Sequence, residues 1–319
     1  MHTYTFRCRW TSDAFLQGYT GSTLRGAFGW ALRQTTCMLR SQQCPTCVLG
    51  KTCAYAWLFA TETYEGREHG GTVNARPHPL VIRPGDPDRR LDGRPERRGD
   101  GSGKAGEAWE FSLLVFGRGR EFLPYLVRSV QAMGESGVGP WTKRGAGRFA
   151  LEKIMAGKEL AYDAASGMFR SDAPGTEIGM GAPPDEPVGR LRVRLRTPLR
   201  LKQENSLQDE LPFHVLVRAA LRRVSALEAA YGAGAPELDY GGLARRAESV
   251  RLAESRLRWR ELQRYSNRQR QKVSLSGMCG EALYEGSLTE FMPLLRYAEK
   301  VHLGKQTLFG LGQVEVQPL

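Results

Sequence analysis

A glycine-rich loop between a helix and a terminal strand most constrains the fold of this sequence, because the arrangement occurs twice. In the first half, GESGVGPWTKRGAG (134–147) follows an amphipathic segment and leads into RFALEKI. In the second half, GKQTLFGLG (304–312) follows another helical pattern and leads into QVEVQ. Glycine allows backbone conformations and close approaches that other residues resist. The recurrence predicts two units of similar architecture.

The segments around the first loop predict a recognised order of strands and helices. Tyr4, Phe6, Cys8 and Trp10 alternate with polar residues, which is the period of a half-buried strand. Apolar residues at helical spacing predict a helix over 22–34. Further elements are expected as strands at 78–84 and 109–117, a helix at 121–134 and a last strand at 148–154. The order β-α-β-β-α-β is that of a ferredoxin-like unit.

The second half predicts the same order. A strand is expected at 190–196 and a five-turn amphipathic helix at 213–231. The remaining elements are expected as an additional helix at 243–262, two weak strands between 262 and 286, and a helix at 288–299. The fold class is therefore α+β, with two tandem ferredoxin-like (RRM-like, βαββαβ) domains.

Two stretches lack an apolar pattern and set the expected domain limits. Residues 83–106 are rich in Gly, Pro, Asp and Arg and predict a long mobile loop. Residues 164–189 have similar composition and are interpreted as an interdomain linker. The expected domains are consequently 1–163 and 190–319.

Charge indicates the class of partner. The chain of 319 residues has a formal net charge of +12, which favours an anionic partner such as nucleic acid. No apolar run approaches the ~18 residues of a membrane span. The N-terminal residues alternate instead of forming a signal-peptide core. These features predict a cytoplasmic protein.

Four of the six cysteines lie within one short segment of the first domain, with the spacing C-x6-C-x2-C-x5-C: Cys37, Cys44, Cys47 and Cys53. In a reducing compartment such a group predicts a metal site sooner than disulfides. Four thiolates close a tetrahedral structural zinc site, although an iron–sulfur cluster has the same ligand number. A closed site leaves no position for substrate, so this insertion is assigned to stability.

Several segments of the second half resemble one protein family: TPLRLK, FHVLVRAALRR, YSNRQRQKVSLSGMCG and VHLGKQTLFGLGQVEV. In the first half LRGAFGWALR, HPLVIRP and FLPYLVRSVQAMGESGVG are similar to the same family. The sequence resembles the CRISPR-associated RAMP superfamily, in particular its endoribonucleases that process CRISPR repeat transcripts. The resemblance implies binding of repeat RNA, retention of the crRNA product and possible association with other CRISPR effector subunits.

The resemblance also implies a reaction. The ribose 2′-hydroxyl attacks the adjacent phosphate without a catalytic metal, and a 2′,3′-cyclic phosphate results. Such cleavage needs a base, an acid and cations that stabilise the charged transition state. Many family members have a histidine on or near the first helix, and residues 22–34 contain none.

Three residues are the candidate catalytic groups. His302 lies at the entry to the second glycine loop, where an imidazole can exchange protons near neutral pH. Arg25 lies on the first helix, where a guanidinium can replace a missing histidine in stabilising charge. Tyr19 precedes that helix, and its phenol is a candidate for proton transfer.

The candidate RNA-binding residues fall into four groups. On the first helix, Arg33 lies eight residues after Arg25 with Gly29 between them, so the two arginines are expected to clamp a phosphate. The others lie on one face of the 213–231 helix, in the basic segment 245–272, and in the second glycine loop: His214, Arg218, Arg222, Arg268, Arg270, Lys272, Gly304, Lys305, Gly310 and Gly312. The regularly spaced arginines of 190–196 are expected to extend this basic surface.

Two other functions fit the same residues. A RAMP subunit that binds guide RNA without cutting it would explain the first helix without histidine. A zinc-stabilised DNA-binding regulator would use the cysteines and the charge, although no helix-turn-helix or finger spacing supports it.

Overall fold

The computed structural model describes residues 1–16, 18–61, 76–85, 103–170, 172–173, 176, 178–203, 206–266 and 271–319. The chain divides into two compact units, the first formed by Met1–Asp86 with Gly93–Glu177 and the second containing Ile178–Leu319. Among the described residues, no helix is long and apolar enough to cross a membrane.

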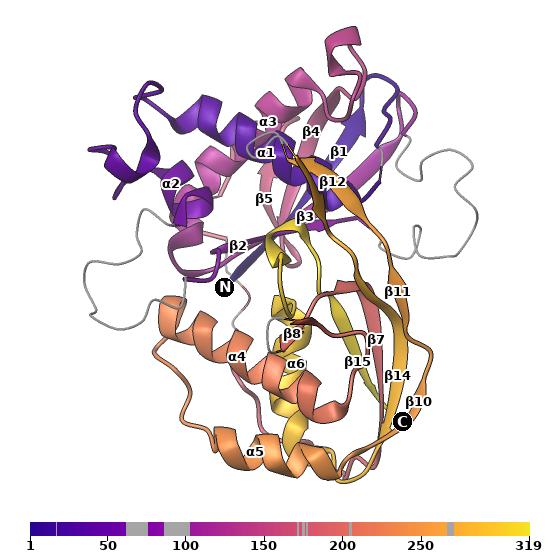
Figure 1. Ribbon diagram of the computed structural model, residues 1–319. Coiled ribbons are helices and arrows are strands. Elements are labelled where there is room, and N and C mark those ends of the chain that lie inside the picture. Colours follow the sequence, from indigo (N-terminus) through magenta and orange to yellow (C-terminus); the bar gives the residue numbers. More distant parts are fainter. Residues whose placement is uncertain are drawn as a thin grey trace. The chain divides into compact units, whose positions relative to one another are not determined.

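The first unit is a six-stranded antiparallel sheet with helices packed against it (Figure 1). Its strands are β1 (His2–Trp10), β2 (Leu80–Pro84), β3 (Ala108–Val115), β4 (Phe149–Ala156), β5 (Glu159–Asp163) and β6 (Met168–Phe169). Its α-helices are α1 (Thr20–Thr36), α2 (Ala54–Phe59) and α3 (Leu123–Ser136). The strand order β2-β3-β1-β4-β5-β6 contains the ferredoxin-like core of the first four strands.

Strand β1 lies at the centre of this sheet, and its alternation produces the core. Tyr4, Phe6, Cys8 and Trp10 are buried, as the sequence predicted. The indole of Trp10 stacks on Trp109 of β3 with ring centroids 4.5 Å apart. Helices α1 and α3 pack on each other, and α3 also contacts β4. The apolar face of the sheet is thereby covered by helices.

The second unit repeats the arrangement (Figure 1). Its main strands are β7 (Arg190–Leu199), β10 (Arg251–Ser255), β11 (Arg258–Arg260), β14 (Gly277–Glu285) and β15 (Val314–Pro318). Its α-helices are α4 (Phe213–Tyr231), α5 (Tyr240–Arg246) and α6 (Met292–Val301), and its small strand pairs are β8 (Lys202–Gln203) with β9 (Ser206–Leu207) and β12 (Gln263–Ser266) with β13 (Gln271–Ser274). The sheet order β10-β14-β7-β15, with β11 also paired to β14, again has the ferredoxin-like pattern.

Two expectations differ from the structure. The helix expected at 243–262 is wrong, because α5 ends at Arg246 and the chain continues as β10 and β11, both paired with β14. Pairing along an exposed sheet edge outweighs the local helical pattern. The strand at Phe149–Ala156 is not the last of the first unit, since β5 and β6 extend the sheet. Most of the loop expected at 83–106 lies outside the described residues.

The glycine-rich loop of the first unit is held by backbone hydrogen bonds to the end of β1. Gly147 N donates to Asp13 O (2.9 Å), and Val138 N donates to Gly147 O (2.9 Å). The hydroxyl of Ser12 accepts a bond from the backbone N–H of Arg148 (2.9 Å). The loop is therefore closed on itself and tied to the central strand.

The glycine-rich loop of the second unit makes the same bonds, with the loop residues 165 positions later and their partners near the strand end 185 positions later. Gly312 N donates to Pro198 O (3.0 Å), and Leu303 N donates to Gly312 O (2.8 Å). The hydroxyl of Thr197 accepts from the backbone N–H of Gln313 (2.9 Å), as Ser12 does in the first unit. A short 3-10 turn lies at the same place in each loop, at Thr142–Arg144 and Thr307–Phe309. The two units thus share atomic detail that their sequences do not show.

These close approaches require glycine. Gly147 and Gly312 have φ values of 72° and 75°, in the left-handed region. A Cβ at Gly147 would overlap the carbonyl oxygen of Val138, and one at Gly312 would overlap that of Leu303. Both glycines therefore serve the fold.

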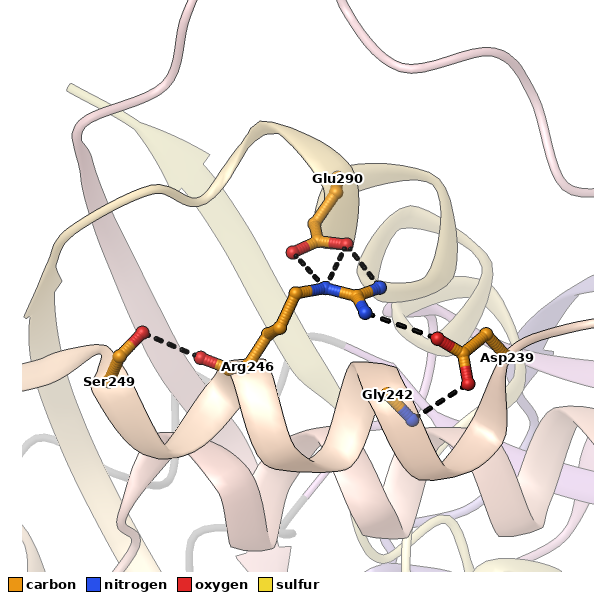
Figure 2. Close-up of polar contacts among 5 residues, drawn as sticks. All are labelled: Asp239, Gly242, Arg246, Ser249 and Glu290. Carbon is orange, nitrogen blue, oxygen red and sulfur yellow. Dashed lines mark hydrogen bonds and ion pairs between the residues drawn. The ribbon is translucent and has the colours of Figure 1, made fainter.

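A polar network joins α5 to the turn before α6 (Figure 2). Asp239 accepts from the backbone N–H of Gly242 (2.8 Å) and so caps the start of α5. Arg246 at the other end of the helix donates to Asp239 (3.1 Å) and to Glu290 (2.8 and 2.9 Å). These hydrogen bonds from Gly242 and then Arg246 lower the pKa of Asp239.

We expect Gly312→Ala and Gly147→Ala to destabilise the protein. Forcing a non-glycine residue into a strained backbone region costs about 1–3 kcal/mol, and the overlap with a carbonyl oxygen adds to that. Thermal and urea unfolding measure the loss. Gly181→Ala is the matched control, because a Cβ at Gly181 meets no atom within 4 Å. Equal stability of the Gly312→Ala and Gly181→Ala proteins would contradict the role given to this loop.

We expect Asp239→Asn to lower the melting temperature at neutral pH. The pKa of Asp239 is lowered in the folded state, so its carboxylate stabilises the fold above the unfolded pKa, and that contribution is lost as pH falls through the lowered folded pKa. The difference in melting temperature between the variant and the wild type should therefore shrink from pH 7 toward pH 3. Asp185→Asn, at an exposed position, is the control. A difference independent of pH would exclude the carboxylate as its source.

Candidate nucleic-acid interface

The second glycine loop begins where α6 ends, at a residue with unusual backbone geometry. His302 has φ 60° and ψ 149°, and Gln306 has φ 62°. In the first unit the residue equivalent to His302 is Gly137, with φ 81°. A non-glycine residue in this region is held there only by its surroundings.

Those surroundings bury His302 completely. Its side chain has no exposed surface, and Nδ1 lies 3.1 Å from the carbonyl oxygen of Leu311. The backbone oxygens of Val301 and His302 accept bonds from the guanidinium of Arg223 (3.1 and 3.2 Å), which places a cation at the C-terminal end of α6. In this position the imidazole holds the loop to the core and does not face solvent. We therefore do not retain His302 as a catalytic group.

The glycines of the loop also serve internal contacts. A Cβ at Gly304 would overlap the carbonyl oxygen of Arg200. The backbone N–H of Lys305 donates to that same oxygen (2.9 Å), so it is not directed at a ligand. Gly310, with φ 81°, ends the 3-10 turn. What the loop presents to solvent is the side chain of Lys305, which is exposed.

The β12–β13 hairpin lies against this loop. The guanidinium carbon of Arg264 is 4.7 Å from the ring centroid of Phe309, and the side-chain amide of Gln306 donates to Ser274 O (3.5 Å). Burial lowers the pKa of Arg264. Tyr265 pairs with Lys272 across the hairpin, so both project from the face opposite Arg264. Tyr265 and Lys272 are exposed.

Arg200, at the junction after β7, is the buried cation beside the same loop. Its guanidinium donates to the carbonyl oxygen of Ser276 and to the hydroxyl of Ser274 (3.4 Å). Burial lowers its pKa, and the carboxylate of Glu261 acts in the opposite direction. We call Arg200, Arg264, Lys272 and Lys305 the glycine-loop cations. Of these, sequence reasoning singled out only Lys272 and Lys305.

On α4, the three residues predicted to bind RNA have different surroundings. Arg218 is bound to Glu248 (3.0 Å), while Arg222 is exposed and His214 is half-buried. Arg223, one residue further, points inward and caps α6. Burial lowers its pKa to about 10. Arg268 and Arg270 lie outside the described residues.

Three of the arginines of β7 that were expected to extend the basic surface are paired with glutamates. Arg190 pairs with Glu285 (3.1 Å), and Arg194 and Arg196 lie 3.8 and 3.6 Å from Glu315. Glutamates on the neighbouring strands β14 and β15 therefore supply the anions. The charge of this face is largely cancelled within the sheet.

In the first unit, the gap between Arg25 and Arg33 is filled by aromatic rings. The Phe59 ring of α2 occupies the space that a Cβ on Gly29 would need. The guanidinium of Arg25 lies 5.1 Å from the Phe59 ring centroid. Arg33 lies 6.0 Å from the ring of Tyr55, which stacks on Phe59. Gly29 therefore serves helix packing, and the two arginines do not enclose an open phosphate site.

Tyr19, the third predicted catalytic residue, is the N-terminal cap residue of α1. Its residue surface is half-buried, and its hydroxyl oxygen is inaccessible to solvent. The phenol is therefore not displayed to a ligand in this conformation.

The four clustered cysteines are close enough to influence one another. Burial raises the pKa of Cys44, Arg33 opposes this, and the thiols of Cys53, Cys37 and Cys47 add to it. Within the described residues, however, no group of three or more His, Cys, Asp or Glu side chains is arranged to hold a metal ion. The metal-binding insertion is therefore not supported by the geometry. Structural zinc remains a prediction from spacing, which elemental analysis of the purified protein would check.

Two family models match the chain. Residues 1–173 match an N-terminal domain family, AF_1859_N, and residues 193–314 match the CRISPR-associated endoribonuclease Cas6. The second match includes most of β7, the β12–β13 hairpin and the whole second glycine loop. A search of curated proteins found no match.

Solved structures have the same fold over the full length. A Cas6 product complex is 14% identical, covers 100% of this chain and 98% of its own, and has a TM-score of 0.54. Thermus thermophilus Cas6 is 14% identical with a TM-score of 0.52, covering 99% of this chain and 98% of its own. A RAMP protein that binds different RNA substrates is 10% identical with a TM-score of 0.50, covering 99% and 100%. Residues 1–173 therefore place the chain in the AF_1859_N family, residues 193–314 match the Cas6 endoribonuclease model, and the likeness to the solved structures shows a shared fold.

Proposed function

We propose that this protein binds CRISPR repeat RNA and cleaves it by attack of a ribose 2′-hydroxyl on the adjacent phosphate, leaving a 2′,3′-cyclic phosphate and retaining the crRNA. The observation that carries the proposal is the match of residues 193–314 to Cas6, because the glycine-loop cations lie within those residues. The solved relatives include a product complex and a RAMP protein with RNA substrates.

The glycine-loop cations suit a phosphate in two ways. Lys272 and Lys305 are exposed and can approach an RNA backbone directly. Arg264 and Arg200 are partly or largely removed from water, which strengthens their attraction for an anion. Cations aimed at developing negative charge are the usual means of stabilising a phosphoryl transition state. We assign these four residues to phosphate binding and charge stabilisation.

No described residue is assigned here as the general acid or the general base. The imidazole of His302 is enclosed in the second unit, so it is not proposed as acid or base. We retain Arg25 as the first-helix group, with charge stabilisation as its role, because a guanidinium stays protonated at neutral pH. The second candidate function is guide-RNA binding without cleavage. It is favoured by the burial of His302 and the absence of histidine from α1.

The reaction is tested with a labelled CRISPR repeat RNA from the protein's own genome. We expect cleavage in EDTA, with a 2′,3′-cyclic phosphate on the upstream fragment, because the nucleophile belongs to the RNA. An RNA with one 2′-deoxy at the cut should bind and stay intact. Tight binding without any cutting would favour the guide-RNA subunit, and cleavage of the deoxy RNA would contradict the mechanism.

We expect Lys305→Ala and Arg264→Ala to weaken binding of the repeat RNA and to reduce the salt dependence of binding. Each lost phosphate contact lowers the slope of log K against log salt by about 0.7–0.9. Fluorescence anisotropy at several salt concentrations measures both effects. Lys158→Ala, at an exposed lysine of the first unit, controls for net charge. Similar changes in all three variants would show that only overall charge matters.

A further inference from the structure

The glycine loops of the two units have the same backbone hydrogen bonds, but their 3-10 turns differ in exposure to solvent. In the second unit the 3-10 turn Thr307–Phe309 is buried, with apolar Leu308 and Phe309 inside. The equivalent turn of the first unit, Thr142–Arg144, has no buried residue, and Lys143 and Arg144 are exposed. The first loop thus displays side chains where the second one packs them away.

An aromatic pair stands beside this exposed turn. Trp141 is 42% exposed and Phe15 is 38% exposed. Their ring centroids are 4.4 Å apart with the planes inclined at 64°, so each ring supports the other. The backbone of Phe15 packs closely on the loop, because a Cβ on Gly139 would overlap its carbonyl oxygen. The pair is therefore a positioned apolar surface in contact with water.

Three basic residues follow Trp141 closely in the sequence of the loop. Lys143, Arg144 and Arg148 are exposed, and within the described part of the chain none of them has an ion pair. The carboxylate of Asp13, whose backbone carbonyl holds the loop, is already bound by Lys104 (3.0 Å) and by the backbone N–H of Ala105 (3.1 Å). The patch consequently combines an aromatic platform with exposed cations that no described acidic residue pairs with.

We propose that this patch, formed by Phe15, Trp141, Lys143, Arg144 and Arg148, is a second RNA contact that stacks one unpaired base and binds its flanking phosphates. An aromatic surface with adjacent cations is the chemistry that binds single-stranded nucleic acid. A base within a paired stem has its faces covered, so the occupant is an unpaired nucleotide of the bound RNA. The inference rests on the proposed RNA function and adds a site remote in sequence from the Cas6 match.

The experiment measures the affinity of the full-length protein for the labelled repeat RNA by fluorescence anisotropy. We expect Trp141→Ala to bind about tenfold more weakly, since stacking on one aromatic side chain contributes about that factor. Trp141→Phe retains a ring and should bind close to wild type. The double variant Lys143→Ala/Arg144→Ala should lower the salt slope by about 1.4, or roughly 0.7 for each phosphate contact. Phe169→Ala, at a comparably exposed ring on β6, is the matched control and should not change affinity.

The outcomes separate this contact from the proposed function. If wild-type protein binds the RNA and Trp141→Ala and the double variant bind it equally well, the patch is not an RNA contact and the function stands. If Trp141→Ala and Trp141→Phe lose the same affinity, stacking is excluded. If wild-type protein binds no RNA, the proposed function and this inference both fail.

Discussion

The backbone hydrogen bond from each glycine loop to the end of its central strand is the contact on which the rest of the structure depends. Gly147 reaches Asp13 in the first unit, and Gly312 reaches Pro198 in the second. Because these bonds are short and directional, they fix where the helix before each loop ends and where the next strand, β4 or β15, begins. They also explain why neither loop tolerates a side chain at that glycine. The backbone of each loop is therefore held by contacts within its own unit, and side chains on the loop are presented from that fixed backbone.

The distribution of charge follows from the sheets as much as from the composition. The arginines of β7 face glutamates on β14 and β15, so a strand that is strongly basic in sequence contributes little net field. Other cations are exposed and, among the residues that the structure describes, have no ion pair. Lys305 on the second loop and Arg144 on the first are two of them. Each loop therefore presents an exposed basic side chain to solvent.

Buried arginines have two different roles in the second unit. Arg223 satisfies the last carbonyl groups of α6 and stabilises a helix end. Arg200 joins the junction after β7 to Ser276 and lies beside the second glycine loop, where a phosphate would meet a poorly hydrated cation. The surroundings of the guanidinium decide whether an arginine caps a helix, as Arg223 does, or is a candidate phosphate-binding group, as Arg200 is.

Local sequence determined the elements whose signals are local. The alternation of β1, the apolar stripe of α4 and the glycines of both loops predicted those elements correctly, because strand period, helix period and glycine conformation act within a few residues. Tertiary structure decided the rest. Residues 251–260 became strands because β14 offered a partner edge, and His302 was buried because its ring is held at Leu311. At Gly29, where a phosphate clamp was expected, the ring of Phe59 packs against the helix. Each of these outcomes depends on a residue distant in sequence, and its physical reason is competition between a local preference and a contact that only the folded chain supplies.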